Sequence, residues 1–222
     1  MTGTEPARLT LARRWYQRPV LEVAPDLLGA LVTTRSADGI TTVRITEVEA
    51  YAGADDPASH AYRGRNARNG VMFGEPGRLY VYRHLGLHHC LNVVCESTGT
   101  AAAVLLRAGE VVEGIKLARA RRLANGALLS DTDLARGPAR LAVALGLDLA
   151  DNGEDVTEAS GRVIVHRREP VTVPASVRGP RVGVGGAGAD AARFSWRWWI
   201  TADPTVSAHR ASPRPVRSRT GT

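Results

Sequence analysis

Two carboxylates and a phenol recur at every second position in the segment Glu47-Val48-Glu49-Ala50-Tyr51. Successive side chains of a β-strand point to opposite faces of the sheet, so a strand here would place Glu47, Glu49 and Tyr51 on one face. A carboxylate held next to a substrate is a suitable general base for activating water. The same spacing also fits the exposed face of an edge strand, and the segment by itself leaves both interpretations open.

The loop predicted after this strand favours the catalytic interpretation. Residues 52–70 are rich in Gly, Asp, Arg and Asn, and they include Asp55, Asp56 and His60. A loop of this length inside a compact domain is usually functional or disordered, and catalytic residues are concentrated on loops that a rigid scaffold positions. His60 alone fits a metal ligand, a contact to a nucleobase or a hydrogen bond within the loop.

Aromatic residues make up only 5% of the chain, yet three of its five tyrosines fall near this predicted site. Tyr80 and Tyr82 share a face of a predicted strand over 78–82, and Tyr51 ends the acidic segment. Aromatic pairs on strands often pack a core, and that interpretation stays open for Tyr80 and Tyr82. Stacked aromatic rings are also the means by which proteins hold a nucleobase that has left the helix.

Three other patterns give little support to other chemistries. His88 and His89 are adjacent and would point to opposite faces of a strand, which is a poor geometry for one metal ion. The glycine motif over 183–188 has no room for the helix and strand that follow in a dinucleotide site, so it is interpreted as a turn. Lys116 is the single lysine among 29 basic residues and is predicted on a solvent-facing helix. We therefore expect water as the nucleophile, and no metal or organic cofactor.

The net charge of +7 lies at the two ends of the chain. Residues 1–18 carry four arginines and one glutamate, and residues 207–222 carry four arginines and no acid. Such ends add non-specific affinity for phosphates or are merely solubilising, so the charge is weak evidence for nucleic-acid binding. Cys90 and Cys95 do not suggest a disulfide framework. No run is apolar enough for a membrane span and no secretory signal is recognisable, so we expect a cytoplasmic protein.

The elements predict a single α+β domain, with a curved and mostly antiparallel sheet, surrounding helices and a protruding β-hairpin. Residues 1–14 are expected to be a flexible basic arm, 15–206 the folded domain and 207–222 a disordered basic tail. The hairpin tip is predicted at 83–86. Strands are predicted over 31–35, 40–51, 78–82, 87–95, 101–107, 162–166, 181–184 and 194–200. Helices are predicted over 25–30, 113–123 and 132–145, the last one broken or bent at Gly137-Pro138.

With these segments assembled, the chain resembles the 3-methyladenine DNA glycosylase family of the alkyladenine type, over about Arg18 to Ser207. The resemblance implies a monofunctional, monomeric base-excision-repair enzyme. Such an enzyme flips alkylated or deaminated purines out of duplex DNA and hydrolyses their N-glycosidic bond. The segments that carry the resemblance are 47–51, 55–60, 69–73, 76–82, 90–92, 104–108, 137–141 and 181–184.

The resemblance also implies roles by position. Glu49 matches the carboxylate that activates water, and Arg107 matches an arginine near that water. Tyr51 and Tyr82 match the rings that sandwich the flipped base, with His60 reading its edge. Four further predictions concern the base pocket and the DNA: Asn92 crowds the amino group of guanine, Met72 enters the minor groove, Leu85 fills the gap left by the flipped nucleotide, and Arg63, Arg65 and Arg68 meet phosphates.

Two features keep alternatives open. The family usually has a tyrosine where this chain has Leu85, and an apolar wedge still unstacks a base step but stacks less well than a ring. A non-catalytic module that binds DNA lesions therefore stays an alternative, and an RNA- or nucleotide-binding domain is a weaker one. The presence of Glu49 favours the enzyme, because a binder has no need of a carboxylate there. The three loop arginines also fit a simply solvated loop.

Overall fold

The sheet is organised around β3 (Gly39–Ala52), its longest strand. One edge of β3 pairs with β6 (Ala102–Glu113) along most of its length. The other edge is shared by β2 (Leu31–Ser36), which pairs with the first half, and β10 (Arg197–Ile200), which pairs with the second half. The acidic segment of β3 therefore has a strand on each side, and both of its carboxylates are fully buried. This burial excludes the exposed edge that the spacing alone allowed.

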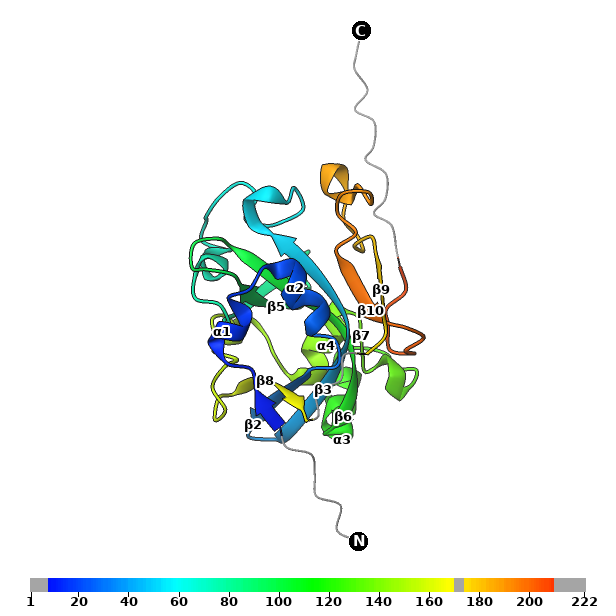
Figure 1. Cartoon of the computed structure of the whole chain (residues 1–222). Helices are drawn as coiled ribbons and strands as arrows, with labels where there is room; N and C mark the ends of the chain where they lie inside the picture. The colour runs from blue at the N-terminus through cyan, green and yellow to red at the C-terminus, as the bar shows by residue number, and fades with distance from the viewer. Residues whose placement is uncertain (1–7, 170–173, 210–222) are drawn as a thin grey trace.

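The structure is a computed structural model that describes residues 8–169 and 174–209. Within these residues all strand pairings are antiparallel, in the order β1-β8-β2-β3-β6-β5-β4, with β7 beside β6 and β9 beside β10 (Figure 1). The single α+β domain with an antiparallel sheet is confirmed.

The remaining strands are β1 (Arg8–Thr10), β4 (Leu79–His84), β5 (His88–Cys95), β7 (Ala135–Arg136), β8 (Val163–Arg168) and β9 (Ser176–Gly179). The α-helices are α1 (Arg13–Tyr16), α2 (Val20–Asp26), α3 (Ile115–Ala124) and α4 (Pro138–Leu145). The 3-10 helices are η1 (Gly53–Asp55), η2 (Gly70–Phe73), η3 (Asp131–Asp133), η4 (Leu149–Asp151) and η5 (Gly186–Ala189).

The main core lies on one face of the sheet. Val48 of β3, Leu106 of β6 and Leu91 of β5 are buried in one apolar cluster with side chains of α2 and α4. Within β5 and the first half of β6 every second residue contributes to that cluster, as the two-residue period of a strand requires, and β3 does so on either side of an irregularity at Ile45–Val48. The residues between them point to the opposite face, which is therefore free to carry polar and aromatic groups.

The predicted helix over 132–145 was wrong in its first half. Residues 131–133 form η3 and 135–136 form β7, which pairs with β6. Gly137 has a φ of +111°, which an L-residue rarely adopts, and Pro138 then starts α4. Proline is favoured at the first position of a helix because it has no backbone N–H to leave unsatisfied. Of the two predicted alternatives, the structure has the break: the helix begins at Pro138, and the residues before Gly137 are not part of it.

Two other predicted elements were displaced. The helix predicted over 25–30 is α2, which spans Val20–Asp26. Pro19 precedes its first turn, and Pro25 falls inside the helix instead of beginning it. The predicted strand over 181–184 is irregular, and the strand of that region is β9, at Ser176–Gly179. No helix in the described part of the chain is long and apolar enough to cross a membrane.

The two ends of the described chain are built into the domain. Arg8–Thr10 pair with β8, and Arg13 begins α1, so the predicted flexible arm does not extend over residues 8–14. At the other end, Ser207 donates its backbone N–H to a carboxylate of β3. Residues 1–7 and 210–222, which hold the rest of the predicted arm and tail, lie outside the described residues.

Gly53 begins the loop after β3 at a φ of +58°, and a Cβ there would lie 2.5 Å from the carbonyl oxygen of Thr100. We expect Gly53→Ala to lower the free energy of unfolding by about 2 kcal/mol or more, because left-handed strain is added to a clash with the backbone. Gly64→Ala is the matched control, since Gly64 has a φ of +86° but open space around it. That control should cost about 1 kcal/mol. Equal losses in urea denaturation would contradict the close approach.

Candidate active site

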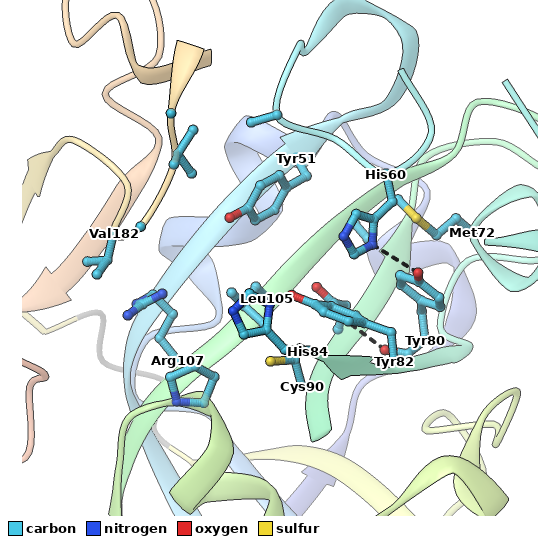
Figure 2. A pocket seen from close by; sticks show the side chains of 17 residues that line it. Tyr51, His60, Met72, Tyr80, Tyr82, His84, Cys90, Leu105, Arg107 and Val182 are labelled. Atoms are coloured by element: carbon cyan, nitrogen blue, oxygen red, sulfur yellow. Dashed lines mark hydrogen bonds between the residues drawn. The ribbon is translucent and has the colours of Figure 1, made fainter. Parts of the chain in front are cut away.

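A cavity of about 430 Å³ lies on the sheet face opposite the main core (Figure 2). Its floor is made by alternate residues of β4, β5 and β6, and Tyr51 of β3 joins it from the side. The intervening residues of the same strands are in the core, so one alternating pattern builds both layers. The floor residues are Tyr80, Tyr82, His84, Cys90, Asn92, Ala103, Leu105 and Arg107.

Three loop segments close the cavity around this floor. The loop after β3 contributes His60, and η2 contributes Met72. The glycine-rich segment 182–185 lines the side opposite these two, next to Arg107 (Figure 2). Asn69, which is fully buried, holds the first loop together, because its amide donates to the carbonyl oxygens of His60 and Gly64 at 2.9 and 3.0 Å. The position of His60 therefore depends on Asn69. This residue belongs to the segment 69–73, and the sequence alone assigns it no role.

The carboxylate of Glu47 accepts four hydrogen bonds from the protein. Arg107 and Arg197 donate their Nε–H groups to its Oε1 at 2.8 and 2.7 Å. Ser207 adds its hydroxyl and its backbone N–H at 2.9 and 2.7 Å. Burial by itself would raise the pKa of Glu47, but the two arginines and the hydrogen bonds from Ser207 hold this pKa below its ordinary value. Glu47 is thus fixed as an anion that orients Arg107.

Glu49 has a different environment on the same face. The Tyr51 hydroxyl donates to its Oε2 at 2.9 Å, and the Val182 backbone N–H donates to its Oε1 at 2.7 Å. The guanidinium of Arg107 lies 3.3 Å from Oε2. Glu49 itself is fully buried and does not line the cavity, whereas these three partners do. It therefore lies directly behind the cavity wall and touches it through each of them.

The aromatic residues that the sequence assigns to a base-binding slot line the cavity. In Figure 2 the ring of Tyr51 lies on one side of the cavity, and His60, Tyr80 and Tyr82 lie on the other. His60 packs edge-on against Tyr82, with 4.5 Å between ring centroids, and its Nδ1 lies 3.0 Å from the hydroxyl of Tyr80. Burial, together with the nearby Arg68 and His84, lowers the pKa of His60 to about 4. A neutral imidazole therefore faces the cavity at neutral pH, with one ring nitrogen left for a ligand.

Asn92 and Met72 both line the cavity, although Met72 was predicted to enter the minor groove of DNA. Asn92 is buried in the floor, where its amide donates to the carbonyl oxygen of Tyr80 at 3.0 Å. Met72, predicted to enter the minor groove, is only 3% exposed and packs with Ala61 and Tyr80 in a small apolar cluster. An enclosed side chain does not reach a groove in this conformation. Met72 instead forms part of the cavity wall.

The hairpin of β4 and β5 presents two leucines at its tip. Leu85 and Leu87 are 80% and 75% exposed. Leu85 has a φ of +49° and Gly86 a φ of +70°, and the Leu87 N–H donates to the carbonyl of His84. Two left-handed central residues are the mark of a type I′ turn, where asparagine and glycine are preferred. A leucine here is strained as well as exposed.

The three loop arginines were predicted as phosphate contacts, and all of them are exposed. Arg68 also packs against the slot, since its guanidinium lies 5.1 Å from the ring centroid of Tyr82. Arg63 and Arg65 lie on the same loop after His60. Among residues 8–169 and 174–209, no group of three or more His, Cys, Asp or Glu residues is arranged to hold a metal ion.

We expect Glu47→Gln to cost about 3–5 kcal/mol of unfolding free energy at about pH 7, because it leaves the buried guanidinium of Arg197 without its anion and Arg107 with Glu49 as its remaining one. The pKa of Glu47 is lowered from 4.5 in the fold, so the stability that its charge contributes is present above that pH and is lost as the pH falls below it. The difference from the unsubstituted protein should therefore shrink below about pH 4.5. Urea denaturation across this range measures it, and a constant difference would contradict the ionic role.

The comparisons with known proteins agree with one another. The sequence pattern of the family described as Methylpurine-DNA glycosylase (MPG) matches residues 14–204. A protein of Streptomyces avermitilis is 52% identical over 216 residues, covering 97% of this chain and 98% of that protein. A Leifsonia xyli subsp. xyli protein is 51% identical and a Mycobacterium tuberculosis protein 46% identical, each over 87% of this chain and about nine-tenths of its own length. All three are provisionally named 3-methyladenine DNA glycosylases. The family predicted from the residues is thereby confirmed, and the chain belongs to the methylpurine-DNA glycosylases.

Proposed function

We propose that this protein flips alkylated or deaminated purines out of duplex DNA inside the cell and hydrolyses their N-glycosidic bond, with Glu49 activating the water. The substrate class is that of 3-methyladenine, 7-methylguanine, hypoxanthine and ethenoadenine. One observation carries the proposal: the buried carboxylate of Glu49 is held by Tyr51, Val182 and Arg107, and all three line a cavity walled by aromatic rings. Family membership supports the same reaction.

The hydrogen bonds of Glu49 leave room for one water molecule. An ionised carboxylate accepts at about four positions. Tyr51 takes one on Oε2 and Val182 takes one on Oε1, and the guanidinium of Arg107 lies 3.3 Å from Oε2 as its ion-pair partner. A water bound at the remaining position of Oε1 would give up its proton to the carboxylate as it attacks the sugar carbon. The negative charge would also oppose the positive charge that develops on the sugar as the base leaves.

The aromatic slot accounts for the base. An extruded purine would stack between Tyr51 and Tyr82, with the free nitrogen of His60 at its edge. N-methylated purines carry a positive charge and leave readily, so stacking and an activated water suffice for them. Neutral purines such as hypoxanthine need a proton on the ring, and the slot would have to tolerate it.

The hairpin tip supplies the wedge. Apolar side chains inserted between base steps unstack them and bend the duplex. Leu85 is the more exposed of the two leucines at the tip and has a left-handed backbone. Strain of this kind persists only where the surrounding structure imposes it, and it is concentrated at functional sites. Flipping one nucleotide requires one wedge and one slot, so a single copy of the chain is sufficient.

We expect Glu49→Gln to reduce base release by about 100-fold or more, because a general base contributes a factor of about that size or larger. Binding of duplex DNA with one hypoxanthine or ethenoadenine should change little, since the slot is kept. Glu110→Gln, at an exposed carboxylate of β6, is the control and should leave both unchanged. Base release is followed by alkaline strand cleavage. Equal losses of release and binding would remove Glu49 from the role of base, and release by neither protein would favour the non-catalytic lesion binder.

We expect Leu85→Asn to raise the free energy of unfolding by about 1 kcal/mol, since asparagine tolerates the left-handed backbone better than leucine. The same change should weaken lesion binding about tenfold, because the apolar wedge is lost. Leu87→Asn is the comparison: Leu87 is equally apolar and exposed, but it does not have a left-handed backbone. It should give no gain in stability. A stabilised Leu85 variant with unchanged lesion binding would show that the tip is not the wedge.

A further inference from the structure

Arg181 and Asp56 form a buried ion pair next to the candidate active site. Their side chains are 1% and 0% exposed. The guanidinium donates to both carboxylate oxygens, with Nη1–Oδ2 at 2.5 Å and Nη2–Oδ1 at 2.7 Å. It also donates to the backbone carbonyls of Ala50 and Gly188, at 2.9 and 3.1 Å. The pair therefore joins the end of β3 and the loop after it to the glycine-rich segment. Asp56 and Arg181 are 125 residues apart in the chain.

Arg181 is linked to two of the three groups that hold Glu49, to one by contact and to the other along the chain. Its Cζ lies 4.6 Å from the ring centroid of Tyr51, whose hydroxyl donates to Oε2. The residue that follows Arg181 is Val182, whose backbone N–H donates to Oε1. Neither Arg181 nor Asp56 lines the cavity. Any effect of the pair on the reaction must therefore pass through its neighbours and not through contact with a substrate.

We propose that the Arg181–Asp56 pair is a positioning device that aims the Glu49 carboxylate through Tyr51 and Val182. This inference rests on the proposed function. Glu49 is otherwise held only by the long side chain of Arg107 in the described structure, and a carboxylate with a single such partner would be free to turn about its last bonds. A shift of about 1 Å at a reacting group is enough to cost a factor of about 100 in rate.

The geometry separates this role from simple stabilisation. Buried ion pairs contribute little net stability, because desolvation offsets their attraction, and replacing both partners by neutral groups is often tolerated. Removing one partner is different, because the other charge is left buried and unpaired. The informative variant is therefore the double substitution Arg181→Met/Asp56→Asn, which removes both charges and keeps similar volumes. Arg181→Lys is a second variant that keeps the charge and loses the two-pronged contact.

The test measures single-turnover release of 7-methylguanine and of hypoxanthine from duplex DNA, together with the Kd for a duplex carrying ethenoadenine. We expect the double variant to lose about 10- to 100-fold in release rate, with a change in Kd of less than about threefold. Arg181→Lys should lie between it and the unsubstituted protein. The matched control is Arg162→Met/Asp151→Asn. It removes another arginine–aspartate pair, with Nε–Oδ1 at 2.5 Å, whose residues are not part of the cavity, and it should not change the rate.

A double-mutant cycle with Glu49→Gln decides the route of the effect. If the pair acts through Glu49, its removal should cost nothing further in the Glu49→Gln background. A full additional loss there, or equal losses in rate and binding, would overturn the proposal. An unchanged release rate in the folded double variant would also overturn it. If the double variant does not fold, the same cycle with Arg181→Lys gives the answer. Absence of base release by the unsubstituted protein would instead refute the proposed function, and this inference with it.

Discussion

The fold depends on the burial of two carboxylates in the middle of a sheet. Glu47 and Glu49 lie on a strand with neighbours on both edges, and leaving them without cations would cost several kcal/mol each. Arg107 from β6 bridges both of them, and Arg197 from β10 completes the neutralisation. This requirement explains why the C-terminal part of the chain returns to pair with β3. A sheet without β10 would leave Glu47 short of a partner and β3 with an open edge at the candidate site.

The site follows from the same alternation that builds the core. Residues of β4, β5 and β6 that point away from the core reach one concave surface, so the aromatic rings, Asn92 and Arg107 need no loop to position them. The groups that cover this floor, among them His60, Met72 and the segment 182–185, come from the loop segments around it. This division places the reacting groups on rigid strands and leaves the covering segments to glycine-rich or hydrogen-bonded loops, where the backbone can be shaped around a ligand.

This alternation also explains what could be predicted from the sequence. The shared face of Glu47, Glu49 and Tyr51, and that of Tyr80 and Tyr82, follow from local periodicity alone. Contacts between distant segments do not: the hydrogen bonds of Ser207 to Glu47 and of Arg181 to Asp56 span 160 and 125 residues. The same limit applies to Met72, whose burial depends on an apolar cluster that only the folded chain brings together. The apolar pattern of 181–184 predicts a strand, but this segment is irregular and lines the cavity. Local periodicity holds no information about that role.

Three departures from ordinary folding rules lie around the cavity and the hairpin that extends from it. They are a pair of buried carboxylates, a histidine kept neutral by burial, and a strained leucine exposed at a hairpin tip. Departures of this kind are tolerated where function requires them and are otherwise removed. A protein that only gripped DNA could use an aromatic cavity, but it would gain nothing from burying the Glu49 carboxylate behind the wall of that cavity. The cost of that burial is therefore the strongest physical argument that the cavity performs hydrolysis rather than binding alone.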